Sequence, residues 1–311
     1  MSASAIGNYS FTINYDDVNV SKSLDDEIEV LYDTIDPNIT LNKGTLWAPE
    51  DQFGIYWNTI DEETGPDRYE IYRNGTLIDT LYGAYTSYLL DLPNGEGDYE
   101  VTVKVYDKVN NTDTDSMIIT LDQTDPELGE IYTDPDNVNG YLLNVEIIEE
   151  LSPQVRLVLY VDGYTLIDTW IDRVDYDQGY DIFITPEDIK ALGVDLIGND
   201  KLLIYIFDQA DNSDYNNYLQ MPQTPRFLTA PENPGGRTIT FTLEETIFAE
   251  KFQLLYSKEP ITELNENVEV VGDFTAFEYS GKFPKSGDYY IAVAAVRGTS
   301  KIAISESIEI S

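Results

Sequence analysis

The stretch that decides the fold is GDYEVTVKVYDKVNNTDTDSMIITL, residues 97–121. Apolar residues alternate with polar ones on both sides of a turn rich in Asp and Asn. The apolar positions are Tyr99, Val101, Val103 and Val105, then Met117, Ile119 and Leu121. Alternation with a period of two predicts two strands with one buried face. The Asp and Asn residues suit a turn with left-handed backbone, so the stretch predicts an antiparallel hairpin.

This hairpin recurs along the chain. Its copies begin at Gly7, Gly97, Gly198 and Gly287, which are 90, 101 and 89 residues apart. A second repeated hairpin lies upstream of it, YEIYRNGTLIDTLY at 69–82 and LVLYVDGYTLIDTW at 157–170, with Asn-Gly and Asp-Gly turns. A period of about 100 residues is typical of one β-sandwich. The sequence therefore predicts an all-β chain of tandem antiparallel β-sandwiches.

Proline-containing segments mark the predicted domain limits. They occur at Pro37, Pro126 and Pro225, where a central strand cannot continue because proline has no backbone N–H. We expect three complete sandwiches at 35–124, 125–224 and 225–311, preceded by a partial repeat at 1–34. A short helix is expected from Thr185 to Leu192, where threonine caps the first turn.

The partial repeat at 1–34 matches only the last two strands of a sandwich. Two strands alone are marginally stable in water. One hypothesis is that this hairpin completes a sheet in a neighbouring subunit by strand addition. The alternatives are that it packs on the first domain, or that the chain is part of a larger protein.

The two repeated hairpins and the closing Asp-Pro segment resemble tandem immunoglobulin-like repeats of large archaeal and bacterial surface proteins. The last domain is similar to a fibronectin type III module, with APENPGGRTITFTL at 230–243 and GDYYIAVAAV at 287–296. Tyr9, Tyr99 and Tyr289 are similar to the tyrosine corner of such sandwiches, and Asp200 breaks this pattern in the third copy. The resemblance implies an external assembly and carries no activity.

Composition excludes several classes of function. Asp and Glu total 58 against 18 Lys and Arg, so the net charge of −40 disfavours nucleic acid and anionic lipid as partners. The chain has no His and no Cys, which excludes Ser-His-Asp and Cys-His catalysis and thiolate metal sites. No apolar stretch approaches the ~18 residues of a membrane span, so we expect no membrane insertion. A carboxylate glycosidase would need two acids facing one cleft, and no motif places them so. We expect no enzyme.

Acidic residues near the domain junctions are the candidate metal ligands, with calcium as the candidate cofactor. The set is Asp122, Asp125, Asp134 and Asp136, with Glu127 between them. Asp208, Asp211 and Asp214 lie near the next junction. For Asp107 and Asp208, which lie in the recurrent turns, we expect a structural role in the turn rather than metal binding.

Two of the three tryptophans are candidate surface aromatics. Trp47 and Trp170 are the candidate binding residues, whereas Trp57 lies in a predicted strand and is expected in a core. The 24 Tyr also suit an adhesive surface.

The sequence thus predicts a non-enzymatic structural protein, outside the cell or on the surface of a cell or virion. It would act as a rigid spacer that binds copies of itself or other surface or virion proteins. The alternative is an adhesin that binds a glycan or a host protein.

Overall fold

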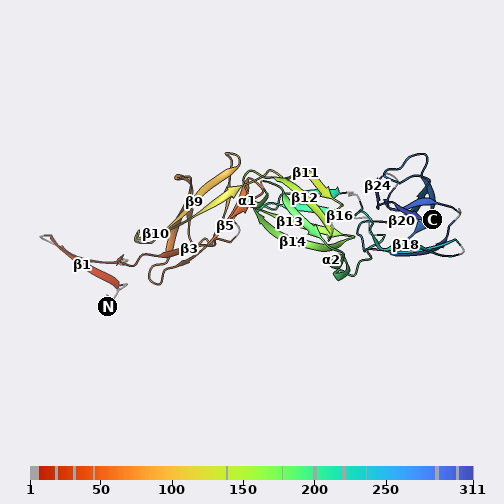
Figure 1. Cartoon of the computed structure of the whole chain (residues 1–311). Helices are drawn as coiled ribbons and strands as arrows, with labels where there is room; N and C mark the ends of the chain where they lie inside the picture. Colours follow the sequence, from red (N-terminus) through yellow and green to blue (C-terminus); the bar gives the residue numbers. More distant parts are fainter. Residues whose placement is uncertain are drawn as a thin grey trace. The chain divides into compact units, whose positions relative to one another are not determined.

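The computed structural model describes residues 7–17, 20–30, 33–44, 46–137, 139–176, 178–198, 202–218, 222–235, 237–283, 287–298 and 301–310. Strands make up 59% of the chain and helices 4%, so the all-β class of tandem β-sandwiches is confirmed (Figure 1). The chain divides into two compact units, Met1–Gln123 and Thr124–Ser311. Among the described residues, no helix has the length and apolar character needed to cross a membrane.

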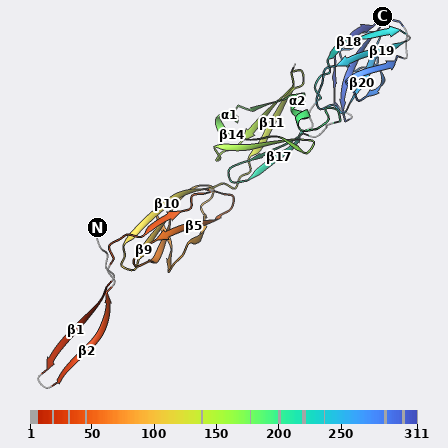
Figure 2. The ribbon, with the colours of Figure 1, turned by 90° about the horizontal axis from the view of Figure 1, so that it is seen from below.

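The predicted N-terminal hairpin is present. Strands β1 (Gly7–Asp17) and β2 (Val20–Val30) pair antiparallel from Gly7 opposite Val30 to Asp17 opposite Val20 (Figure 2). They form a two-stranded sheet that includes no other described strand. Strand exchange with a neighbour stays a prediction.

The first sandwich consists of a three-stranded and a five-stranded sheet. The three-stranded sheet has, in order, β3 (Asn38–Leu41), β5 (Gln52–Ile60) and β8 (Ser87–Asp91). The five-stranded sheet has, in order, β4 (Trp47–Ala48), β10 (Thr112–Leu121), β9 (Gly97–Asp107), β6 (Pro66–Arg73) and β7 (Thr76–Tyr82). The β9–β10 hairpin has the expected alternation, and Val101 lies opposite Met117 with both buried. Asn74 and Gly75 both have positive φ, 48° and 73°, as a type I′ turn requires. Trp57 is buried in this core, as expected.

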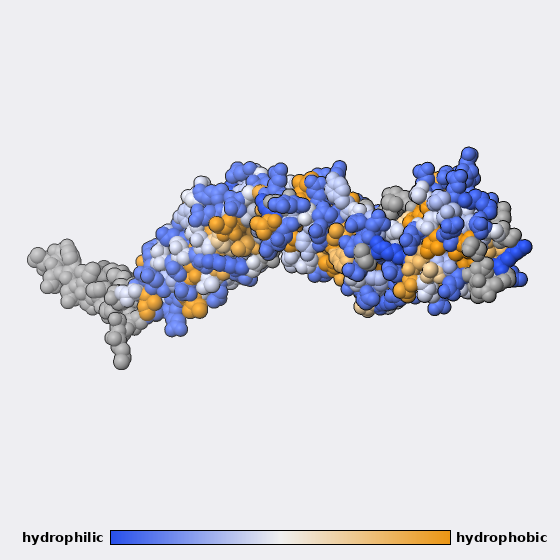
Figure 3. Space-filling model, viewed as in Figure 1, coloured by the Kyte–Doolittle hydropathy of each residue, from blue (hydrophilic) through white to orange (hydrophobic). Residues whose placement is uncertain are grey.

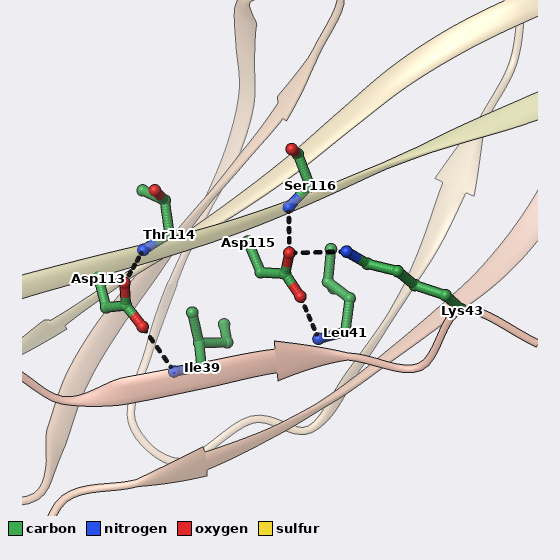
Figure 4. A network of polar contacts seen from close by, with 7 residues as sticks. All are labelled: Ile39, Leu41, Lys43, Asp113, Thr114, Asp115 and Ser116. Carbon is green, nitrogen blue, oxygen red and sulfur yellow. Dashed lines mark hydrogen bonds and ion pairs between the residues drawn. The ribbon is translucent and has the colours of Figure 1, made fainter.

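Two carboxylates hold the outer edge of β3. Asp113 and Asp115 lie on the inward side of β10, and their Oδ2 atoms accept hydrogen bonds from Ile39 N (3.0 Å) and Leu41 N (2.9 Å) (Figure 4). The Lys43 ammonium donates to Asp115 Oδ1 at 2.9 Å. Backbone N–H groups that β5 does not use are therefore paired, and the edge of the sandwich is closed by side chains.

The second sandwich has a three-stranded and a four-stranded sheet. The three-stranded sheet has, in order, β11 (Glu127–Asp134), β12 (Tyr141–Ile148) and β15 (Tyr180–Ile184). The four-stranded sheet has, in order, β14 (Tyr164–Asp172), β13 (Gln154–Val161), β16 (Leu202–Phe207) and β17 (Ser213–Tyr218). A short helix α1 (Arg173–Tyr176) follows β14. The expected helix is α2 (Pro186–Ala191), where Thr185 and Asp188 form a capping box.

The third sandwich pairs three strands with a larger sheet. The first sheet has β18 (Phe227–Gly235), β19 (Thr238–Leu243) and β22 (Glu278–Lys282), and the second has β21 (Glu269–Phe274), β20 (Lys251–Ser257), β23 (Tyr289–Arg297), β24 (Lys301–Ile304) and β25 (Ile308–Ile310). Aromatic rings contact one another in its core. For example, the Phe241 and Tyr279 rings stack with their centres 5.1 Å apart.

The second and third sandwiches share a packed junction. Ile247 and Phe248, which precede β20, belong to the core of the second sandwich and are fully buried. The Phe248 ring packs edge-on against Tyr141 at 5.3 Å. Ala249 forms a parallel bridge with Ile197. Because apolar side chains of one sandwich complete the core of the other, we treat the two as one unit.

Candidate binding face and carboxylate cluster

The outer face of the four-stranded sheet in the second sandwich is the first candidate site. Along β13, Val155, Leu157, Leu159 and Val161 are buried in the core. The residues between them face outward, and the register places Arg156 opposite both Trp170 and Phe207. In the same way Tyr205 lies opposite Val158 and Tyr215. Directly opposed residues share one side of a sheet, so these side chains form a single surface.

Five aromatic residues dominate this surface, which we name the aromatic face: Tyr160, Trp170, Tyr205, Phe207 and Tyr215. The Tyr205 ring stacks on Tyr215 at 5.4 Å and on Phe207 at 6.1 Å, and meets Tyr160 edge-on at 5.8 Å. Outward-facing Val158 is only 3% exposed, whereas Trp170 and Tyr215 are 49% and 59% exposed. The rings therefore support one another and still present a broad apolar surface to solvent.

An ion pair crosses the aromatic face. Arg156 donates from Nε to Asp168 Oδ1 and from Nη2 to Oδ2, both at 2.7 Å. The guanidinium also lies 5.8 Å from the centre of the Phe207 ring. The hydrogen bonds from Arg156 lower the pKa of Asp168, which keeps the carboxylate ionised. The pair itself contributes no net charge. Asp172 lies opposite Gln154 on the same side of the sheet and accepts from the Gln154 amide, so the described face has no excess positive charge.

Polar groups on the aromatic face remain available. Within the described part of the chain, the hydroxyl groups of Tyr160, Tyr205 and Tyr215 take part in no hydrogen bond. Each hydroxyl can donate one hydrogen bond and accept others. The face therefore combines flat rings with groups able to recognise a polar ligand.

The corresponding face of the first sandwich is arranged differently. There the hydroxyls of Tyr72 and Tyr106 donate to Glu70 at 2.6 and 2.9 Å, and the Arg68 guanidinium covers the Tyr106 ring at 3.6 Å. The hydrogen bond to Glu70 raises the pKa of Tyr72 to about 12. Rings and hydroxyls of this face are engaged internally, so the second sandwich offers the better binding surface.

The structure separates the two predicted surface tryptophans. Trp170 lies on the aromatic face and is 49% exposed, and its role in binding stays a prediction. Trp47 is half-buried on β4, beside Thr120 of β10 in the first sandwich. Tyr160, Tyr205 and Tyr215 were not predicted from the sequence. The signal for Tyr160 and Tyr205 was the aromatic residue at a nominally polar position of the alternating segments LVLYV and LLIYIF, and Tyr215 lies outside both segments.

A carboxylate cluster in the first sandwich is the second candidate site. Carboxylate oxygens of Asp33, Asp61 and Asp107 lie within 4.8 Å of one another, although the residues precede β3, follow β5 and end β9. Asp107 is fully buried and Asp33 is 7% exposed. The members of this cluster are far apart in the chain, so no local pattern predicts it.

Hydrogen bonds position each carboxylate of the cluster. Asp107 Oδ1 accepts from Val109 N and Asn111 N at 2.9 and 2.8 Å, which confirms its expected role in the turn. Asp33 accepts from Ile35 N and from the Thr64 hydroxyl, both at 2.8 Å. Burial by itself would raise the pKa of Asp33, but these bonds outweigh it and lower the pKa.

The cluster fits a hard divalent cation. Oδ2 of Asp61 is buried and has no hydrogen-bond partner among the described residues. Nearby Glu63 has a raised pKa, first because of desolvation and then because of the Asp33 and Asp61 carboxylates. Like charges held together out of water are unfavourable unless a proton or a cation balances them. Calcium takes about six to eight oxygen ligands, and Asp33, Asp61 and Asp107 would supply some of them.

The second sandwich repeats part of this arrangement. Asp208 is fully buried and accepts from Ala210 N and Asn212 N at 2.7 and 2.9 Å, so its expected turn role is also confirmed. Burial raises the pKa of Asp208, and the Glu149 carboxylate adds to the rise. Each of the two sandwiches therefore has a buried aspartate where the corresponding strand ends, Asp107 at the end of β9 and Asp208 directly after β16.

The four carboxylates predicted to bind calcium do not form one cluster. Asp122 is buried just after β10, where its N–H donates to Ala48 O at 2.9 Å. Asp125 precedes β11 and accepts from Ser213 N, whereas Asp134 and Asp136 lie at its other end. A strand of this length separates its ends by roughly 25 Å. Asp125 therefore cannot share a metal ion with Asp134 and Asp136.

Comparison with known proteins gives the fold alone. No family model matches the chain, and no curated protein matches it. Among solved structures, it resembles the fibronectin(III)-like modules of Clostridium thermocellum CbhA, with 13% identity and a TM-score of 0.41 over 58% of this chain and 90% of that one.

Two further solved structures are similar. A tetra-tandem repeat from the extending region of a large adhesion protein is 18% identical, with a TM-score of 0.28 over 96% of this chain and 79% of that one. A segment of two fibronectin type III domains from chicken tenascin is 14% identical, with a TM-score of 0.33 over 59% and 97%. The expected likeness to tandem immunoglobulin-like and fibronectin type III sandwiches is confirmed. A prokaryotic surface or virion origin stays a prediction.

Proposed function

We propose that this chain is a non-enzymatic protein of an external assembly, which acts as a spacer and makes adhesive contact through the aromatic face. The observation that carries the proposal is the exposed aromatic face of the second sandwich, where Trp170 and Tyr215 are 49% and 59% exposed in a chain with a net charge of −40. Aromatic side chains such as Trp170 and Tyr215 present a large, rigid contact area that suits a binding surface. Hydrophilic residues cover most of the surface visible in Figure 3.

The packed junction between the second and third sandwiches supports the role of spacer. Phe248 precedes the first strand of the larger sheet of the third sandwich but is buried in the core of the second. Bending at the junction would therefore expose a large apolar side chain. A junction of this kind holds a distance between a contact face and the rest of an assembly.

The external location is tested by labelling the intact source cell or particle with antibodies raised against the full chain. We expect labelling without permeabilisation. Labelling that requires permeabilisation would contradict an external role.

Self-association is a second candidate role, favoured by the two-stranded sheet of β1 and β2, which no other described strand joins. Mass photometry and electron microscopy of the full chain and of a chain lacking residues 1–34 would test it. Assemblies that vanish on deletion would support strand addition. Assemblies that persist without residues 1–34 would exclude strand addition by this hairpin.

A further inference from the structure

We infer that the aromatic face of the second sandwich binds an uncharged carbohydrate chain. This inference deepens the proposed function by naming the class of partner, and it depends on that function only for the external location. Its observations are the extent of the face, its charge and the chemical groups that it presents.

The extent of the face is too small for a stable protein interface. The rings lie on four adjacent strands, which span about 14 Å, and from Arg156 to Tyr160 along β13, which is about 13 Å. The resulting area is on the order of 200 Å², whereas a stable protein interface buries ~800 Å² on each partner. A surface of this size accommodates a few sugar rings lying flat.

The charge of the face selects an uncharged ligand. Arg156 is paired with Asp168 through two hydrogen bonds, and Asp172 lies on the same side of the sheet, so the described residues of the face present no free cation to an acidic polymer. The whole chain repels anions because its net charge is −40. A cationic partner would bind more strongly to the many acidic positions elsewhere. A neutral ligand has no such preference and gains most from the apolar rings.

The groups on the face match the two sides of a sugar. The C–H groups of a sugar ring form a flat apolar surface that packs on aromatic rings such as Trp170 and Tyr215. Its hydroxyl groups can pair with the tyrosine hydroxyls and with the Arg156–Asp168 ion pair. Because Tyr205 is stacked between Phe207 and Tyr215, the rings are already ordered and lose little side-chain freedom on binding.

The test uses the full chain in affinity electrophoresis against three uncharged polymers, hydroxyethylcellulose, galactomannan and dextran, with polygalacturonate as the acidic comparison. We expect retardation by at least one uncharged polymer and none by polygalacturonate. Trp170→Ala and Tyr215→Ala should each weaken binding about ten-fold, because each removes one stacking surface. Both residues are about half exposed, so the fold is retained, which circular dichroism verifies.

Tyr132→Ala is the matched control, because Tyr132 is 59% exposed on β11 in the other sheet of the same sandwich. It should bind as the wild type does. The inference is wrong if no uncharged polymer retards the chain, or if the Trp170→Ala/Tyr215→Ala double variant binds as well as the wild type. A dimer that requires Trp170 and excludes the polymers would assign the face to a second copy instead.

The test separates this inference from the proposed function. Binding of an uncharged polymer by a chain that is never labelled on intact cells would refute the external role alone. External labelling without polymer binding would refute only the carbohydrate ligand.

Discussion

Replacing both Asp113 and Asp115 with alanine removes the carboxylates that hold β3, and we expect the first sandwich to lose about 3–6 kcal/mol of its free energy of unfolding. Each carboxylate accepts one hydrogen bond from a β3 backbone N–H, at 3.0 and 2.9 Å. A hydrogen bond to a charged group contributes about 1.5–3 kcal/mol, and the two are taken as additive. The Lys43 ion pair adds less than about 1 kcal/mol because the lysine side chain is 49% exposed.

The assay is urea unfolding followed by tryptophan fluorescence in a Trp170→Phe background. The chain has three tryptophans, and this change leaves Trp47 and Trp57, which both lie in the first sandwich. Trp57 is 4% exposed, so its emission reports the opening of that core alone. The transition of the other unit does not contribute.

Asp98→Ala is the control for loss of an acidic residue from the same hairpin. Within the described residues, the Asp98 side chain accepts a single hydrogen bond, from the Thr120 hydroxyl at 2.7 Å on the exposed side, and we expect a change below about 1 kcal/mol. If the double variant also stays within about 1 kcal/mol of the wild type, the carboxylates do not stabilise β3.

Acid and calcium should each change the stability of the first sandwich, and replacement of Phe248 should lower the stability of the unit 124–311. Hydrogen bonds from Leu41 and Lys43 outweigh burial and lower the pKa of Asp115, so its contribution is complete above pH ~4 and disappears as the pH falls through the folded value. The difference between wild type and double variant should therefore shrink from pH 7 to pH 3 in the same urea assay. Calcium should raise the melting temperature of the first sandwich, and a chelator should reverse the rise. Asp61→Asn should abolish this effect of calcium. An unchanged melting temperature in the wild type would argue against a metal at the carboxylate cluster. Phe248→Ala should cost the unit 124–311 about 3–5 kcal/mol in differential scanning calorimetry, with Leu228→Ala, 67% exposed, as the control. Equal losses for these two variants would show that the junction is not a shared core.

Local patterns predicted much of the fold. The β9–β10 hairpin followed from strict alternation around an Asp- and Asn-rich turn, and α2 followed from the cap at Thr185, because both signals lie within about a dozen residues. The junction did not follow. Phe248 comes from a segment without periodicity and is buried in a core built by earlier residues, which only tertiary structure can show.

The candidate sites show the same division between local and distant information. Trp170 was predicted as a candidate surface aromatic from its place at the end of a repeated hairpin. Its partners Tyr205 and Tyr215 could not be assigned to the same surface, because strand order brings β16 and β17 beside β13. The cluster of Asp33, Asp61 and Asp107 likewise depends on three loops that meet only after folding.

The carboxylates on β3 also determine how the first sandwich responds to mechanical force. A pull on the N-terminal end acts along β3, whereas its backbone bonds to β5 and its bonds to Asp113 and Asp115 lie across that direction. Bonds loaded sideways share the load and must break together, so β3 resists shear rather than peeling away one bond at a time. Acid that protonates Asp115 would therefore lower the rupture force before the sandwich unfolds.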